Sequence, residues 1–332
     1  MTHPHQILTI CLPALWENVI PNPLNGRQFT RATPETAKVF PGCLPPHPAS
    51  LYPQSASRLE YFHTPARLPR LTPQHNSPVA APPLAVILAA GRGTRMGSDL
   101  PKVLAEAAGK PLVRWVLDAL DQAGISDRIV VVGYRAELVE TALAEIPGVS
   151  FARQAQQRGT GDAVAAAADQ IASRLAAPGG PNRPVVIVCG DSPMLRPESI
   201  QSLLQQFAAR PTACLLGSAL ANDPSGLGRI VRDAAGRFEK IVEEKDATAA
   251  QRAIQEVNMS TYVFAAADLL QALQQLNTAN ASGEYYLTDC PGLLLASGRP
   301  VAAVACLDPS ETLSVNNPAQ LNAVAEALLA RR

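Results

Sequence analysis

Residues 88–102 read Leu88-Ala-Ala-Gly-Arg-Gly-Thr-Arg-Met-Gly-Ser-Asp-Leu-Pro-Lys102 and directly follow an apolar run long enough to form a buried strand. Gly91 and Gly93 allow the backbone after this strand to turn sharply and to approach a ligand closely. Bare backbone N–H groups in such a turn form a concave site for an anion. Because Arg95 and Lys102 add two positive charges, the stretch predicts a strand followed by a binding site for a triphosphate.

Two well-known phosphate-binding loops do not match this stretch. The Walker pattern ends in Gly-Lys-Ser/Thr, which is absent, and the dinucleotide pattern needs a third glycine where this chain has Met96. An ordinary strand-to-helix turn with solvated basic residues is the alternative interpretation. The Arg-Met pair and the Pro-Lys pair within the stretch favour the phosphate site.

The composition restricts the classes of function. The chain has 332 residues, 47% of them hydrophobic, and a formal net charge of +0, so nothing suggests a broad nucleic-acid-binding surface. Its 6 cysteines form no CxxC motif, which argues against a disulfide framework or a zinc site. No apolar run reaches the roughly 18 residues of a membrane span. We therefore expect a cytoplasmic protein that binds neither nucleic acid nor membrane.

Residues 1–83 differ from the rest of the chain. They contain 16 of the 30 prolines, and each proline fixes φ and removes a backbone donor. We expect a disordered or loosely attached leader, or an extension from an early start codon. All 5 histidines also lie there. The remainder therefore has no histidine for a Ser-His triad, a general base or a metal site.

From residue 84 onward the pattern alternates between strand and helix. Such alternation predicts an α/β fold: a Rossmann-like, mostly parallel mixed sheet with helices on both faces, preceded by the disordered leader. Ligands bind such sheets at the carboxyl ends of the strands, where the 88–102 loop and Asp191 fall. The expected strands are 84–88, 128–132 and 184–189, and the expected helices are 111–123, 136–146, 160–175 and 197–209.

After about residue 212 the alternation is less regular. Short β-prone pieces separated by Gly and Asp suggest an excursion at the open edge of the sheet, suited to holding a second substrate. An amphipathic helix is expected over 318–331. The β-prone pieces are 213–218, 228–232, 237–243 and 256–264.

Several motifs in a fixed order carry a family resemblance. With the 88–104 pattern they look like the sugar-1-phosphate nucleotidyltransferases, and within these like the uridyltransferase domain of the bifunctional N-acetylglucosamine-1-phosphate uridyltransferase/glucosamine-1-phosphate acetyltransferase. The resemblance covers about 84–328. The further motifs are Gln154-Ala-Gln-Gln-Arg-Gly-Thr-Gly161, Gly190-Asp-Ser-Pro193, Gly226-Leu-Gly-Arg-Ile230, Ile241-Val-Glu-Glu-Lys-Asp246, Gly283-Glu-Tyr-Tyr-Leu-Thr-Asp289 and Val315-Asn-Asn317.

The resemblance implies the nucleotide-diphospho-sugar transferase fold and a Mg²⁺-dependent reaction. A sugar 1-phosphate, N-acetylglucosamine 1-phosphate, attacks the α-phosphorus of UTP, and pyrophosphate leaves. The attacking phosphate oxygen is already anionic, which fits a domain without histidine. The implied organisation is a leader (1–83) and a nucleotidyltransferase domain (84–332), with a nucleotide-binding half (84–211), a sugar-binding half (212–317) and the C-terminal helix (318–331).

The resemblance also implies a role for each motif residue. Arg95 and Lys102 are the expected catalytic residues, which hold the phosphates and the developing negative charge. Asp191 and Asn316 are the expected Mg²⁺ ligands. The expected nucleotide-binding residues are Leu88, Ala89, Ala90, Gly91, Gln154, Gly159 and Thr160, with Gln154 reading the uracil edge. The expected sugar-binding residues are Gly228, Glu243, Asn258 and Thr288, with Tyr286 as a further candidate for the pocket wall.

Taken singly, these residues also have ordinary structural explanations. Asp191 follows a strand and precedes Pro193, as a helix N-cap does. The stretch Asn316-Asn317-Pro318 is typical of a turn that caps the last helix. Glu243 belongs to a pair of glutamates, and such pairs are usually solvated. The occurrence of all the motifs in order favours the functional interpretation.

The chain departs from the family pattern in places. Asn258-Met-Ser260 stands where Asn-Thr-Gly is usual, Cys189 replaces an aromatic residue and Glu244 replaces a frequent histidine. The acetyltransferase β-helix is missing, so neither acetylation nor a trimer is expected. Two alternatives stay open: nucleotidyl transfer to another hexose 1-phosphate or from another base, and a regulatory protein that binds nucleotide-sugar without catalysis.

Overall fold

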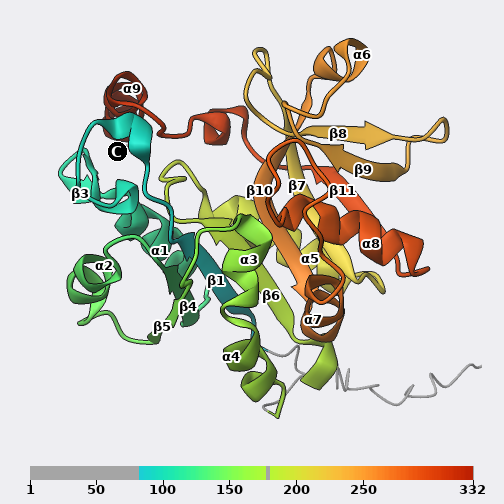
Figure 1. Cartoon of the computed structure of the whole chain (residues 1–332), viewed down its shortest axis with the longest axis horizontal. Helices are drawn as coiled ribbons and strands as arrows, with labels where there is room; N and C mark the ends of the chain where they lie inside the picture. The colour runs from blue at the N-terminus through green and yellow to red at the C-terminus, as the bar shows by residue number, and fades with distance from the viewer. Residues whose placement is uncertain (1–81, 177–179, 332) are drawn as a thin grey trace, which may run out of the picture. The chain divides into compact units, whose positions relative to one another are not determined.

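Strand β1 (Leu84–Ala89) lies at the centre of a mixed sheet in the computed structural model, which describes residues 82–176 and 180–331 (Figure 1). The strand is apolar throughout and buried on both sides, as its sequence predicts. The order of strands across the sheet is β11-β7-β10-β6-β1-β4-β5, with β8 and β9 branching off beside β10. The leader expected over 1–83 lies outside the described residues, apart from Pro82 and Pro83.

In the described part of the chain, β10 alone among the seven strands of this path runs against the others. The predicted mostly parallel mixed sheet is therefore confirmed. The other strands on the path are β4 (Asp127–Val132), β5 (Val149–Arg153), β6 (Pro184–Cys189), β7 (Cys214–Leu220), β10 (Glu256–Ala265) and β11 (Val301–Ala305). The branch consists of β8 (Arg229–Arg232) and β9 (Phe238–Val242), and a separate hairpin pairs β2 (Glu106–Ala107) with β3 (Lys110–Pro111).

Successive side chains of the central strands are buried on opposite faces of the sheet. Val86 and Ile187 belong to one hydrophobic cluster and Ile87 and Val186 to another. The first cluster is covered by α3 (Thr160–Ala165), α4 (Ala168–Ser173), α7 (Ala266–Leu273) and α8 (Cys290–Ala296). The second is covered by α1 (Leu112–Gln122), α2 (Ala136–Leu143) and α5 (Pro197–Ala208). Helices thus pack on both faces, as predicted.

One sequence-based expectation needs correction. The single helix predicted over 160–175 is divided into α3, α4 and a short 3-10 turn, because the chain bends at Ala166 and Ala167. The segment after residue 212 adds to the sheet at the edge left open by β6, as expected, since β10 and β7 extend the sheet from that strand. The short helix α6 (Ala249–Arg252) lies between β9 and β10.

The last helix, α9 (Pro318–Ala330), buries Val324 and Leu328 in a third cluster. Met194 and Val315 belong to the same cluster. The guanidinium of Arg331 also donates to the carbonyl of Met194 at 3.0 Å. Helix α9 therefore packs against two loops from distant parts of the chain. One of these loops follows β6, and the other leads into α9.

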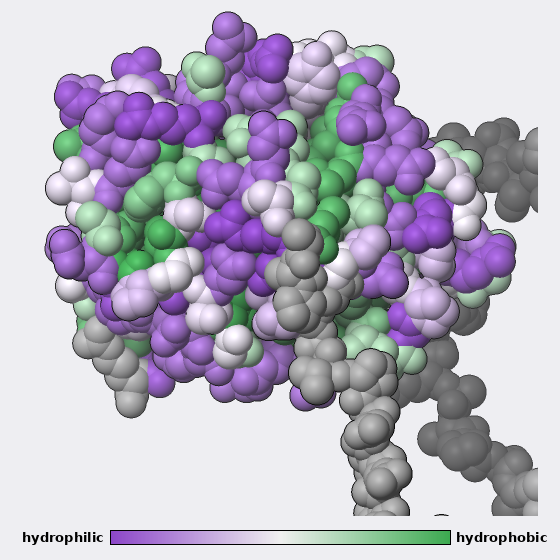
Figure 2. All heavy atoms as spheres, turned by 90° about the horizontal axis from the view of Figure 1, so that it is seen from below, coloured by the Kyte–Doolittle hydropathy of each residue, from purple (hydrophilic) through white to green (hydrophobic). Residues whose placement is uncertain are grey.

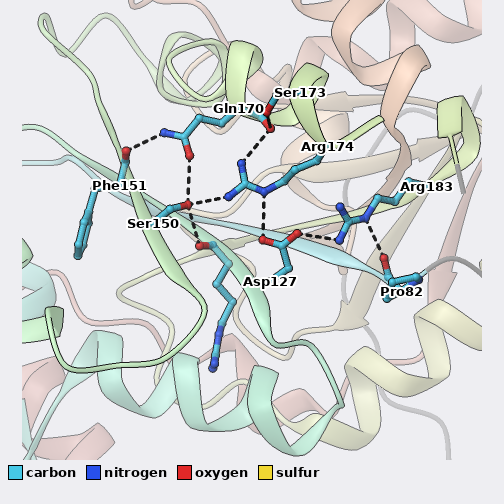
Figure 3. A network of polar contacts seen from close by, with 9 residues as sticks. Pro82, Asp127, Ser150, Phe151, Gln170, Ser173, Arg174 and Arg183 are labelled. Carbon is cyan, nitrogen blue, oxygen red and sulfur yellow. Dashed lines mark hydrogen bonds and ion pairs between the residues drawn. The ribbon is translucent and has the colours of Figure 1, made fainter. Parts of the chain in front are cut away.

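A polar network ties the amino ends of the parallel strands together (Figure 3). The carboxylate of Asp127 accepts from Arg174 at 3.1 Å and from Arg183 at 2.8 Å. Arg183 also donates to the carbonyl of Pro82 at 2.9 Å, and Arg174 donates to the hydroxyl of Ser150 at 2.9 Å. This network, which we call the Asp127 cluster, anchors β1, β4, β5 and β6 at their starting ends.

Seen from below, the surface is mostly hydrophilic, with small apolar patches between polar side chains (Figure 2). No helix within residues 82–176 and 180–331 combines the length and the apolar character that crossing a membrane requires.

Candidate functional site

The loop after β1 turns at glycines in the left-handed region. Gly93 has φ 68° and Gly97 has φ 64°. A Cβ on Gly93 would lie 2.6 Å from the Cβ of Lys102, so a side chain is excluded there on two grounds. Gly91 does not have a positive φ, and no atom lies within 4 Å of where its Cβ would stand. The turn therefore depends on Gly93, while the backbone at Gly91 faces open space.

Four residues from three distant segments of the chain meet beside this loop. The Lys102 ammonium donates to Asn316 Oδ1 at 3.1 Å and forms an ion pair with the carboxylate of Asp191. The guanidinium of Arg95 donates to the same Asn316 Oδ1 at 3.2 Å. We call Arg95, Lys102, Asp191 and Asn316 the phosphate-side cluster. The structure thus brings together both expected catalytic cations and both expected metal ligands.

The donor set of this cluster suits a hard cation. One carboxylate and one amide oxygen converge on the same ammonium group, so both face one point in space. Mg²⁺ prefers oxygen ligands and is commonly held by one or two protein groups together with phosphates and water. Within 82–176 and 180–331, no three His, Cys, Asp or Glu side chains gather in a way that could hold a metal.

The N-cap residues of α5 and α9 show whether Asp191 and Asn316 act as helix caps. Helix α5 begins at Pro197 with Arg196 as its N-cap residue, so Asp191 caps no helix there. Asn317 is the N-cap of α9, because its side chain accepts from the backbone N–H of Gln320 at 2.9 Å. Asn316 is thus left to face Lys102, with its own Nδ2 3.3 Å from the hydroxyl of Ser314.

A large cavity lies beside the phosphate-side cluster. It has a volume of about 580 Å³, and both Arg95 and Asn316 line it. Its other walls come from the loop 221–227 and the segment 309–324. The cluster therefore has space beside it for a ligand of nucleotide size.

Backbone contacts hold the segment 88–91 between two strand ends. The carbonyl of Leu88 accepts from the N–H of Gly190 at 2.8 Å, and the carbonyl of Ala90 accepts from the N–H of Tyr134 at 3.0 Å. Ala89 and Ala90 are buried, and Gly91 is exposed. The segment is thus fixed rigidly, and Gly91 is its accessible end. Its predicted contact with uracil and ribose stays a prediction.

The side-chain amide of Gln154 already has hydrogen-bond partners within the protein. It is 5% exposed, and its Nε2 donates to the carbonyl of Gly159 at 3.1 Å and to the carboxylate of Asp162 at 2.7 Å. The amide is therefore turned toward the start of α3. Reading of the uracil edge by Gln154 stays a prediction, and it requires a change in these contacts or use of the amide oxygen.

The segment 158–161 joins the predicted nucleotide and sugar halves. Gly159 has φ 118°, and a Cβ there would overlap the carbonyl oxygen of Tyr285. The N–H of Gly161 donates to that carbonyl at 2.8 Å, and the N–H of Tyr285 donates to the carbonyl of Arg158 at 2.8 Å. The hydroxyl of Thr160 accepts from the N–H of Leu287 at 3.0 Å. These contacts form a continuous seam between the two segments.

The four expected sugar-binding residues lie together. A Cβ on Gly228 would lie 3.5 Å from the Cβ of Asn258 and 3.6 Å from Glu243 Oε1. The hydroxyl of Thr288 donates to Glu243 Oε1 at 3.0 Å. Burial raises the pKa of Glu243, and the Thr288 hydrogen bond partly offsets this. A cavity of about 210 Å³ adjoins Glu243 and Thr288, with Tyr286 also in its wall.

Three residues that the sequence analysis left without a role, or treated only as departures, lie close to this group. Burial raises the pKa of the Cys189 thiol to about 12, and the N–H of Ser260 donates to Asn258 Oδ1 at 3.2 Å. Tyr262 is buried, and its hydroxyl accepts from Asn258 Nδ2 at 2.7 Å. A tyrosine inside an apolar strand is itself a signal, because a buried hydroxyl needs a partner.

The third departure from the family pattern is explained by a neighbouring charge. Glu244 forms an ion pair of 2.7 Å with Arg229, which is 1% exposed. A buried arginine needs an anionic or carbonyl partner. Arg229 also donates to the carbonyl of Arg252, so Glu244 belongs to the support of β8.

Comparison with known proteins identifies the family of the chain. Residues 85–288 match the MobA-like NTP transferase domain. The bifunctional protein GlmU of Exiguobacterium sp. is 43% identical over 248 residues, which are 75% of this chain and 53% of that protein. The same protein of Geobacter metallireducens is 43% identical over 71% of this chain and 48% of its own, and that of Lactococcus lactis subsp. cremoris is 41% identical over 75% and 52%. The chain spans about half the length of these relatives.

A solved structure supports the fold independently of sequence. UDP-glucose pyrophosphorylase complexed with UDP-glucose aligns with a TM-score of 0.57 at 17% identity, over 75% of this chain and 99% of that one. The family resemblance drawn from the motifs is thereby confirmed at the level of sequence, and the nucleotide-sugar transferase fold at the level of structure. The chain belongs to the family of MobA-like NTP transferase domains.

Proposed function

We propose that this protein transfers the uridylyl group of UTP to N-acetylglucosamine 1-phosphate, with Mg²⁺, and so forms UDP-N-acetylglucosamine and pyrophosphate in the cytoplasm. The observation that carries the proposal is the convergence of Lys102, Arg95, Asp191 and Asn316 beside a glycine turn and a cavity of about 580 Å³. The similarity to the bifunctional relatives supports the choice of this sugar phosphate.

The reaction requires positioning and charge neutralisation rather than a base. A phosphate oxygen of the sugar 1-phosphate forms a bond to the α-phosphorus of UTP, and the bond from that phosphorus to the β-phosphate oxygen breaks. Lys102 and Arg95 hold the phosphates and stabilise the charge that develops on the leaving pyrophosphate. Asp191 and Asn316 would hold Mg²⁺, which supplies further positive charge to the phosphates. No side chain has to be deprotonated.

The sugar would bind at the second group of residues. Glu243 offers a carboxylate to hydroxyl groups, Gly228 offers its backbone, and Asn258 offers an amide. Thr288 holds Glu243 in place through the 3.0 Å hydrogen bond. A charged acceptor strengthens such hydrogen bonds.

One observation favours a different sugar 1-phosphate as a second candidate. Ser260, which departs from the family pattern, has φ 49° and donates its N–H to Asn258 Oδ1 at 3.2 Å. The departure therefore adjoins an expected sugar-binding residue. The second candidate function is therefore uridylyl transfer to another hexose 1-phosphate.

A substrate panel tests both candidates. Pyrophosphate release is measured with each of ATP, CTP, GTP and UTP against several hexose and hexosamine 1-phosphates at saturating Mg²⁺. The highest kcat/KM is expected for UTP with N-acetylglucosamine 1-phosphate. A higher value for a sugar without the N-acetyl group would replace the first candidate by the second. Absence of turnover with every sugar 1-phosphate would reject nucleotidyl transfer as proposed.

A further inference from the structure

The amide of Asn258 is held from both ends. Its Nδ2 donates to the hydroxyl of Tyr262 at 2.7 Å, and its Oδ1 accepts from the N–H of Ser260 at 3.2 Å. Its own backbone N–H donates to the carbonyl of Gly228 at 2.8 Å. Asn258 is 5% exposed. An amide has two donor hydrogens and two acceptor lone pairs, so one N–H and one lone pair are left for a ligand.

Tyr262 lies in the body of β10 rather than in the site. It is 1% exposed, and its ring packs against Phe264 with the centroids 5.9 Å apart. Burial raises the pKa of its phenol well above the usual value, and the nearby charge of Glu243 adds to this. The hydroxyl is therefore neutral, and its direction is fixed by a rigid strand.

A β-bulge brings the two groups together. The register between β10 and β7 shifts between Asn258 and Thr261, and Ser260 has a left-handed φ of 49°. Such a bulge redirects a side chain, and a residue other than glycine adopts this φ only when its surroundings fix it. Here the bulge turns the N–H of Ser260 back onto Asn258 while Tyr262 stays in the regular strand.

We propose that Tyr262 is a positioning residue for the sugar subsite: by accepting one N–H of Asn258 it fixes the plane of the amide, so that the other N–H meets the hydroxyl or amide groups of the sugar 1-phosphate bound beside Gly228 and Glu243. Tyr262 itself does not touch the substrate. The inference rests on the proposed function, and it adds a determinant of affinity and selectivity for the sugar that lies behind the binding surface.

The test compares Tyr262→Phe with a packing control. Tyr262→Phe keeps the ring and removes only the acceptor, so the KM for the sugar 1-phosphate is expected to rise about three- to tenfold, which corresponds to one hydrogen bond. The KM for UTP and kcat are expected to stay within about twofold. The selectivity between N-acetylglucosamine and glucose 1-phosphates should fall. Phe264→Leu, a change of packing on the same strand, should lower the Tm and leave all three kinetic values unchanged.

A double-mutant cycle separates positioning from a general effect on the fold. In an Asn258→Ala background, Tyr262→Phe should cause no further rise in the KM for the sugar, because the amide that it positions is gone. Equal rises with and without Asn258 would overturn the proposal. So would an unchanged KM in Tyr262→Phe, or a parallel rise in the KM for UTP.

The substrate panel with the wild type distinguishes a failure of the proposed function from a failure of the role proposed for Tyr262. If the wild type prefers another sugar 1-phosphate, the proposed substrate is wrong, and the same variants are measured with the preferred sugar, so that Tyr262 is still tested. If the wild type turns over no sugar 1-phosphate, the proposed function and the role of Tyr262 are both overturned. If the wild type behaves as proposed and the variants do not, only the inference on Tyr262 fails.

Discussion

The two ends of the sheet both carry clusters of charge, yet only one resembles a site. In the Asp127 cluster, Arg183 is 4% exposed, and both arginines donate to the carboxylate and also to backbone carbonyls. In the phosphate-side cluster, Arg95 is exposed and adjoins a cavity of about 580 Å³.

The two clusters differ in the partners of their hydrogen-bond donors. At the amino ends of the strands, the donors of Arg174 and Arg183 close a network with the backbone (Figure 3). At the carboxyl ends, two cations converge on a single amide oxygen, and the turn beside them depends on Gly93. A cluster whose cations are saturated stabilises the fold, whereas exposed cations beside a cavity are available to an anionic ligand.

Removing Lys102 should have the largest effect on turnover. In Lys102→Ala, kcat is expected to fall roughly a thousandfold, because a fixed charge beside the phosphates acts mainly on the transition state. The Tm should change little. Steady-state pyrophosphate release and a thermal melt measure both. A kcat within a few-fold of the wild type would show that the phosphate-side cluster is not the reacting centre.

Asp191→Asn should have the next largest effect and should depend on the metal. We expect kcat to fall about a hundredfold and the Mg²⁺ concentration at half-maximal activity to rise, because an amide is a weaker ligand for a hard cation. Titration of Mg²⁺ against activity, together with Mn²⁺ binding by calorimetry, measures this. An unchanged Mn²⁺ affinity would remove Asp191 from the metal site.

The corresponding substitution in the Asp127 cluster should lower stability and leave turnover unchanged. Asp127→Ala leaves Arg174 and Arg183 without their carboxylate, and the free energy of unfolding is expected to fall by about 2 kcal/mol. The expected loss is kept small because Asp127 and Arg174 are partly exposed to solvent. The kcat and both KM values should stay within twofold. Urea unfolding and the kinetic assay test this together, and a large loss of kcat would contradict the contrast between the two clusters.

Glu243→Gln should give the smallest change in stability and one that depends on pH. Burial raises the pKa of Glu243 in the folded state, so its favourable contribution is present at low pH and is lost as the pH rises and the buried group ionises. The variant should therefore be more stable than the wild type at pH 8, with the advantage disappearing toward pH 4. Melting curves across this range measure it.

The same variant should bind the sugar more weakly. Loss of a charged acceptor is expected to raise the KM for the sugar 1-phosphate by roughly tenfold or more, with little change in the KM for UTP. A variant that is stabilised at pH 8 yet unchanged toward the sugar would place Glu243 outside the sugar site.

The central strands could be predicted because their apolar runs are continuous. β1 and β6 are buried on both faces, and each is followed by a glycine turn or a Gly-Asp pair. β5 was not predicted, because this edge strand is half exposed and its residues, Val149–Arg153, do not form a clear apolar pattern. The bend at Ala166 and Ala167 has no sequence signal either, since alanine favours a helix on both sides of it.

The residues of the two site clusters could be named from motifs, but their mutual contacts could not. The bulge at Ser260 is a tertiary feature: a serine has no intrinsic preference for φ 49°, so the sequence gives no warning that Asn258 and Tyr262 will meet. Likewise, Asn316 and Asn317 are identical in chemistry, and only the start of α9 decides that the second is the cap and the first faces Lys102.

Helix α9 connects the two oxygen donors of the phosphate-side cluster mechanically. Its first turn is capped by the residue next to Asn316, and its far end is bonded to Met194 in the loop that carries Asp191. A shift of this helix by a fraction of an ångström would therefore alter the gap between the carboxylate and the amide. The position of this helix therefore controls the spacing of the two oxygen groups that are the expected ligands of the ion.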